Sequence, residues 1–65
     1  MPDQNGNSLR LWAKVAVASP TEEHRGYKGE RGTIIRIIPG WDAEIKFDDP
    51  AVENHIFEGR ELLLG

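Results

Sequence analysis

Apolar and polar residues alternate one by one through segment 41–48, and this alternation constrains the fold more than any other feature. The apolar positions are Trp41, Ala43, Ile45 and Phe47. A period of two residues is that of a β-strand with one buried face. The preceding segment, Thr33–Ile38, contains four isoleucines and one threonine, which favour strands, and Pro39-Gly40 then favours a tight turn. The pattern therefore predicts a β-hairpin over residues 33–48.

Three further segments have the features of short strands. Leu11–Ala18 alternates in the same way until Pro20, which cannot donate to a sheet, and Val52–Phe57 and Leu62–Leu64 are short apolar runs. No segment has the period of a helix. Five short strands in one small chain predict an all-β fold, closed or nearly closed into a barrel, because closure removes the exposed edges of a sheet.

The other segments are interpreted as loops and a tail. Residues 1–8 are polar and predict a flexible N-terminal tail, so that the folded domain spans residues 9–65. Residues 21–32 hold three glycines and six charged residues, which predicts a long polar loop with at most one helical turn after Thr21. Residues 58–61 predict a one-turn connector.

Length and composition narrow the function classes. A chain of 65 residues is short for one domain, and without cysteine and with only two histidines it offers no disulfide and too few ligands for a structural zinc. No apolar run approaches the roughly 20 residues of a membrane span, and the N-terminus lacks a secretory pattern. We therefore expect a cytoplasmic protein without cofactor or metal, and no membrane partner.

One segment resembles a known sequence motif. It is Lys28-Gly29-Glu30-Arg31-Gly32-Thr33-Ile34, which follows the Val15-Ala16-Val17 strand. This arrangement resembles the KOW motif. With residues 24–27 and 45–48 added, the chain also looks like the SH3-like barrel of nitrile hydratase beta subunits, of the small photosystem I subunit and of the variable chain of ferredoxin-thioredoxin reductase. It is similar as well to small phage or plasmid SH3-like proteins. The resemblance implies a small five-stranded SH3-like barrel. Independently of it, Gly29 and Gly32 predict a sharp turn with positive φ or a close backbone approach.

The candidate binding residues gather in the loop between the first two strands. An aromatic side chain among cations is a common composition for a binding surface, and Trp12 should project from the outer face of the first strand. We expect the loop residues on one exposed ridge, with Tyr27 packed back onto the barrel as the alternative. The predicted binding residues are Trp12, His24, Arg25, Tyr27, Lys28 and Arg31.

The remaining side chains of chemical interest predict core or solvent positions. We expect Ile34, Ile45 and Phe47 in the core, and Trp41 in the core or at its edge. His24 and His55 are far apart in sequence and are expected to be two separate exposed histidines. No serine or threonine has a histidine at a suggestive spacing, and a chain this small hardly forms a pocket, so we do not expect an enzyme.

Three function classes stay open. The leading interpretation is a protein-binding module or accessory subunit that acts through the loop. The second is a KOW-like nucleic-acid or ribosome-associated protein, for which Arg25, Lys28, Arg31 and Arg36 argue, although the net charge of −3 disfavours it. The third is a phage or plasmid protein that inhibits a host machine, since residues 38–65 carry two basic and seven acidic side chains. The partner and the oligomeric state are not determined by the sequence.

Overall fold

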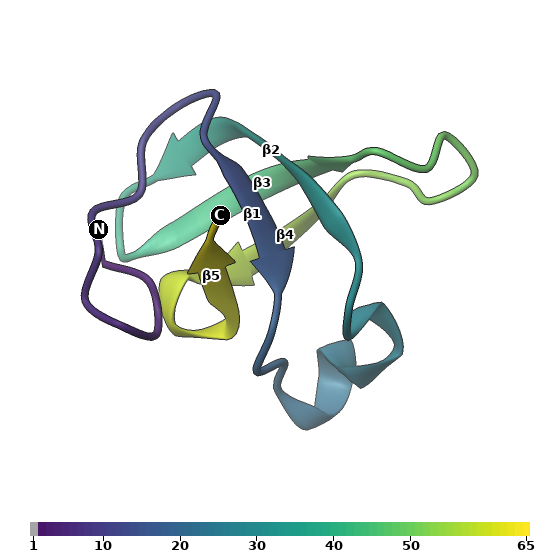
Figure 1. Cartoon of the computed structure of the whole chain (residues 1–65), viewed down its shortest axis with the longest axis horizontal. Helices are drawn as coiled ribbons and strands as arrows, with labels where there is room; N and C mark the ends of the chain where they lie inside the picture. The colour runs from purple at the N-terminus through teal and green to yellow at the C-terminus, as the bar shows by residue number, and fades with distance from the viewer. Residues whose placement is uncertain (1) are drawn as a thin grey trace.

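The computed structural model describes residues 2–65, and Met1 lies outside the described residues. Five strands and two short 3-10 helices follow one another along the chain (Figure 1). They are β1 (Lys14–Val17), η1 (Glu22–Tyr27), β2 (Arg31–Ile38), β3 (Asp42–Phe47), β4 (His55–Glu58), η2 (Gly59–Glu61) and β5 (Leu62–Leu64). The all-β prediction is confirmed.

All strands belong to one antiparallel sheet with the order β4-β3-β2-β1-β5. The predicted hairpin is present as β2 and β3, in which Ile34 lies opposite Ile45 and Ile38 lies opposite Asp42. A bulge between Ile34 and Arg36 shifts the register inside this hairpin. This arrangement is consistent with an SH3-like fold.

The sheet does not close into a barrel, which corrects the expectation of a closed structure. Strands β4 and β5 end the strand order and are not paired with each other in the part of the chain described. They are instead joined end to end by η2. The two edge strands, β4 and β5, are therefore connected by the turn η2 and not by hydrogen bonds between their backbones.

The core lies on the inner face of the sheet. Ile34 and Ile45 are fully buried and Phe47 is 4% exposed, so these three predicted core residues are confirmed. The other buried apolar residues lie on β1, β3, β4, β5 and the segment before β1. They are Leu9, Val15, Val17, Ala43, Phe57 and Leu62.

The two glycines of the turn into β2 serve both predicted purposes. Gly29 has a φ of +88°, a conformation that side chains with a Cβ rarely adopt. Gly32 allows a close approach, because a Cβ there would lie 2.5 Å from the Lys46 carbonyl oxygen and 2.7 Å from the Ile45 Cγ2. The tight entry into β2 therefore depends on both glycines.

Residues 2–8, which the sequence predicts as a flexible tail, form a turn with defined contacts to the domain. Asp3 is 5% exposed, and its carboxylate accepts hydrogen bonds from the backbone N–H of Asn5, Asn7 and Leu64 at 2.8 to 2.9 Å. The N–H of Gln4 donates to the carbonyl of Leu62 at 3.0 Å. Figure 1 shows this purple segment beside the yellow β5 and η2. The N-terminal turn thus covers the outer edge of β5.

Candidate functional site

Both tryptophans are exposed and have an unusual backbone conformation. Trp12 is 70% exposed with a φ of +69°, and Trp41 is 62% exposed with a φ of +76°. Among residues 2–65 no other non-glycine residue has a positive φ. The left-handed region costs a bulky residue about 1 to 3 kcal/mol, and such residues cluster at functional sites. The two tryptophan turns are therefore candidate sites.

Trp41 is not in the core, which corrects the expectation drawn from its alternation with Ala43, Ile45 and Phe47. The turn between β2 and β3 comprises Pro39, Gly40 and Trp41, and β3 begins only at Asp42. Gly40 has a φ of +100° and Trp41 follows it in the left-handed region. This turn, which the periodicity alone does not reveal, directs the indole away from the sheet.

Two hollows of the surface meet at Trp41. One, of about 210 Å³, is apolar and lined by Ile37, Ile38, Pro39, Gly40 and Trp41. The other, of about 370 Å³, lies between Trp41, the N-terminal turn and the start of η2, and is lined by Pro2, Asp3, Gly40, Trp41, Glu58, Gly59 and Arg60. We call the residues lining both hollows the Trp41 surface. Exposed aromatic side chains and surface hollows are both common at binding sites, so the Trp41 surface is the main candidate site.

The larger hollow contains charged groups at one end. The Nε of Arg60 donates to a carboxylate oxygen of Glu58 at 2.6 Å, and both side chains are substantially exposed. Asp3 faces the same hollow, with its carboxylate engaged by backbone N–H groups. The N–H of Leu64 is the main cause that holds the pKa of the Asp3 carboxyl below its usual value, although burial opposes it. Asp3 therefore supplies a negative charge, held in place by hydrogen bonds, to the hollow that Trp41 also lines.

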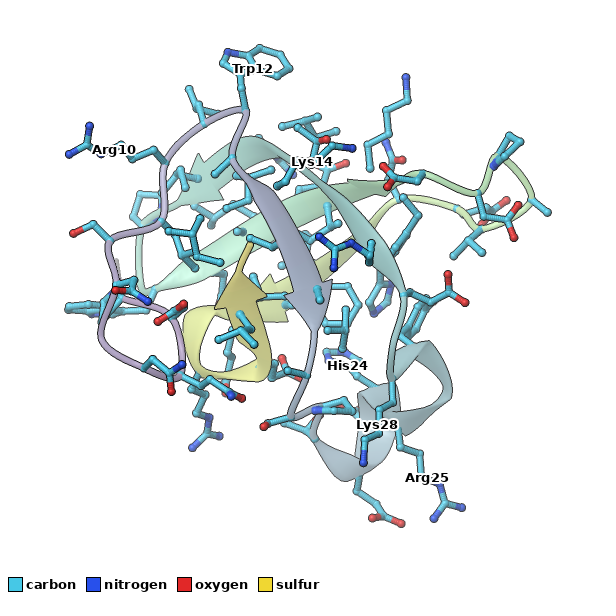
Figure 2. The ribbon with its side chains drawn as sticks, viewed as in Figure 1. Arg10, Trp12, Lys14, His24, Arg25 and Lys28 are labelled. Carbon is cyan, nitrogen blue, oxygen red and sulfur yellow. The ribbon has the colours of Figure 1, made fainter. Side chains whose placement is uncertain are left out.

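The predicted loop residues do not all share one exposed ridge. Arg25 and Lys28 are exposed at the end of the molecule formed by η1 (Figure 2). Tyr27 instead packs back onto the sheet, stacked on Phe47 with ring centroids 5.5 Å apart and on His55 at 5.0 Å. The alternative position for Tyr27 is thus the one that the structure adopts.

Arg31 and Trp12 lie apart from that end. Arg31 begins β2, and its guanidinium donates to the carbonyl of Gly65. Trp12 stands at the opposite end of the molecule from Arg25 and Lys28 in Figure 2. It lies in a turn before β1, where its N–H donates to the carbonyl of Ile34 at 2.7 Å, so Leu11 and Trp12 are not in the strand as expected.

The two histidines are neighbours, which corrects the expectation that they are separate. The rings of His24 and His55 meet edge to face, with centroids 4.8 Å apart, and both pack near Phe57. The Nδ1 of His24 lies 2.9 Å from Oε1 of Glu61. Because an ionised carboxylate only accepts, this ring nitrogen carries the proton.

Glu61 is fully buried and joins η1 to η2. Its carboxylate accepts from the N–H of Thr21 and from the N–H of Glu58, each at 2.8 Å, and from His24. Burial raises the pKa of the Glu61 carboxyl, but these hydrogen bonds outweigh it and hold the pKa below its usual value. We interpret the Glu61–His24 pair as a structural contact that holds the two 3-10 helices together. No sequence pattern indicates this contact, because the two residues are 37 positions apart.

Half of the cations in residues 2–65 are engaged in ion pairs within the molecule. Of the eight lysines and arginines, four form ion pairs with carboxylates, namely Lys14, Arg25, Arg36 and Arg60. Within residues 2–65 no group of three or more histidine or acidic side chains is placed to hold a metal ion. In the same residues no helix is long and apolar enough to cross a membrane.

Comparison of the chain with protein-family models, curated proteins and solved structures finds no significant match. The function is therefore argued from the surfaces of the molecule.

Proposed function

We propose that this chain is a non-catalytic protein-binding module or accessory subunit that recognises its partner through the Trp41 surface. The observation that carries the proposal is the position of Trp41, 62% exposed and located between two hollows. Tryptophan and arginine are the side chains that most often dominate binding energy at protein interfaces, and here Trp41 and Arg60 line the same hollow.

The charge distribution favours a protein partner over nucleic acid. Nucleic-acid affinity depends on a surplus of cations, whereas half of the lysines and arginines have a carboxylate beside them that would repel a phosphate. The net charge of −3 acts in the same direction. A KOW-like nucleic-acid role is thus the weaker alternative, and inhibition of a host machine would be one form of protein binding.

The loop surface predicted from the sequence has a smaller part in this proposal. Arg25 and Lys28 are exposed and available for a second contact. Tyr27 contributes mainly to packing, because it stacks on Phe47 and His55. We therefore place the main contact at Trp41 and treat the loop as an additional contact.

The test is affinity capture from the native host by the wild-type protein, Trp41→Ala and Trp12→Ala, followed by titration of the recovered partner. Trp12→Ala tests the other candidate turn, since Trp12 is 70% exposed but lies outside both hollows. We expect Trp41→Ala to weaken binding more than tenfold, because a hot-spot truncation costs about 2 kcal/mol or more, and Trp12→Ala to leave it unchanged. Capture that nuclease treatment abolishes, or binding that Trp41→Ala leaves intact, would contradict the proposal.

A further inference from the structure

Two carboxylates occupy an electrostatically unfavourable position next to Trp41. Asp42 on β3 lies directly opposite Glu58 on β4, so both side chains project from the same face of the sheet. Like charges in such opposite positions destabilise a sheet. Within residues 2–65 Asp42 forms no ion pair, and only Glu58 is compensated, by Arg60. A position that costs stability in this way is well suited to a partner that supplies positive charge.

Arg60 indicates which kind of group the larger hollow accommodates. Its guanidinium lies in the lining of the hollow with Trp41, and its Nε is 2.6 Å from the Glu58 carboxylate. The side chain is nevertheless 76% exposed and is held only by this one exposed ion pair. Exposed ion pairs of this kind are worth about 1 kcal/mol or less, so another cation can replace Arg60 at low cost.

The indole and the local charge favour a cation. Asp3 and Glu58 line the hollow against the single guanidinium of Arg60, which gives the lining a net charge of −1. Asp42 adds a further carboxylate opposite Glu58 on the neighbouring strand. The face of a tryptophan ring attracts ammonium and guanidinium groups as well. A phosphate group would be repelled by the same carboxylates.

We propose that the larger hollow beside Trp41 binds an arginine or lysine side chain from a basic segment of the protein partner, and that Arg60 occupies part of this position in the free chain. The inference rests on the proposed function and specifies the chemistry of its partner. The adjacent apolar hollow of Ile37, Ile38 and Pro39 then receives a neighbouring apolar side chain of the same segment. The partner segment is thus basic and apolar, complementary in charge to the hollow.

Two blocked nonapeptides with the same leucine, glycine and serine positions, one with three arginines and one with three glutamates, serve as probes. Binding is followed by NMR at the Trp41 indole N–H. The arginine peptide should bind and the glutamate peptide should not. Because Arg60 competes for the same position, Arg60→Gln should strengthen binding of the arginine peptide about two- to fivefold, the range of one exposed ion pair. Asp42→Asn and Glu58→Gln should each weaken it by a similar factor.

Lys14→Gln is the matched control, because Lys14 is also largely exposed and forms a similar exposed ion pair, with Asp48, outside the hollow. It should not change binding, and thermal melting of each variant verifies that it is folded. The inference is wrong if the arginine peptide causes no shift at Trp41, if Arg60→Gln weakens its binding, or if the glutamate peptide binds more tightly. Loss of partner binding in Trp41→Ala together with any of these results would retain the proposed function and reject only the cationic ligand.

Discussion

At the scale of single residues, Trp12 and Trp41 combine exposure with a backbone conformation that tryptophan rarely adopts. Each is more than 60% exposed, so neither gains much by burial, and each has a φ near +70°. A residue that is both strained and exposed contributes little to folding. Stabilising substitutions at such positions commonly reduce function, which is consistent with a binding role for at least one of the two.

Glycine at either tryptophan position should relieve the strain. Trp12→Gly is expected to raise the free energy of unfolding by up to about 1 kcal/mol, since glycine adopts a positive φ without a steric cost. Urea denaturation measures the change, and Trp12→Ala, which keeps a Cβ, is the control. A loss of stability in Trp12→Gly larger than in Trp12→Ala would show that the φ of +69° is not strained.

Ile45 should carry a large share of the stability, because it is fully buried in the centre of the sheet. Ile45→Ala is expected to cost about 2 to 5 kcal/mol, which is comparable with the whole stability of a small domain. Ile56, 39% exposed, provides the control, and Ile56→Ala should cost less than about 1 kcal/mol. Equal midpoints of urea unfolding for the two variants would contradict the assignment of the core face.

Gly32 is required for the close approach of β2 and β3. In Gly32→Ala the new Cβ would meet backbone atoms of Lys46 at 2.5 to 3.0 Å, so we expect a loss of about 1 to 3 kcal/mol. At Gly26 in η1 an added Cβ would have no atom within 4 Å, and the φ is not positive, so Gly26→Ala should be tolerated. Thermal melts of the two variants compare their stabilities directly. If Gly32→Ala were as stable as Gly26→Ala, β2 and β3 would have to lie further apart at this point than the structure has them.

At the scale of elements, two buried carboxylates each join two short segments of the chain. Asp3 attaches the N-terminal turn to β5, and Glu61 attaches η1 to η2. Both groups accept several backbone hydrogen bonds. Ionised carboxylates therefore contribute to the attachment of these segments, and in η1 the packing of Tyr27 on Phe47 adds to it.

The protein should consequently lose stability in acid. The pKa values of the Asp3 and Glu61 carboxyls are lower in the folded chain than their usual values, so the unfolded chain binds protons first as the pH falls. The contribution of these groups is complete above about pH 5 and is lost from about pH 4 downward, as the pH approaches the lowered folded-state values. Melting temperatures from pH 2 to 7 should show this loss, and Asp3→Asn should flatten part of the curve, whereas exposed Glu53→Gln should not.

Hydrogen exchange at neutral pH measures whether the N-terminal turn stays attached to β5 in solution. If Asp3 holds it against β5 in solution, the amides of Asn7 and Leu64 should be protected in the wild type and exchange faster in Asp3→Asn, because the carboxylate accepts from both. Fast exchange at the Asn7 amide in the wild type would instead support the flexible tail expected from the sequence.

At the scale of the whole molecule, the net charge of −3 and the carboxylates beside half of the cations should limit binding to polyanions. We expect no binding to an oligothymidine at moderate salt, measured by fluorescence anisotropy. Should binding occur, Lys28→Ala and Arg31→Ala would each lower the salt dependence by about one unit of slope, because each removes one phosphate contact. That result would favour the KOW-like alternative over the protein partner.

The sequence by itself determined the all-β fold class, the central hairpin and three of the buried core residues. Alternation of apolar residues in β3 and the isoleucines of β2 predicted the central hairpin with Ile34, Ile45 and Phe47 inside, and the glycines predicted its tight entry. These features can be predicted from the sequence because the period of a strand and the conformational freedom of glycine are local properties of the chain.

Only the tertiary structure decided where Trp41 and the paired polar side chains lie. Trp41 follows the alternation of β3 in sequence, yet a positive φ at the end of the turn directs it outward. The contact of His24 with His55 and Glu61, and that of Asp3 with Leu64, join residues 31 to 61 positions apart. Such contacts depend on how the curved sheet brings distant turns together, and no local pattern of residues encodes that arrangement.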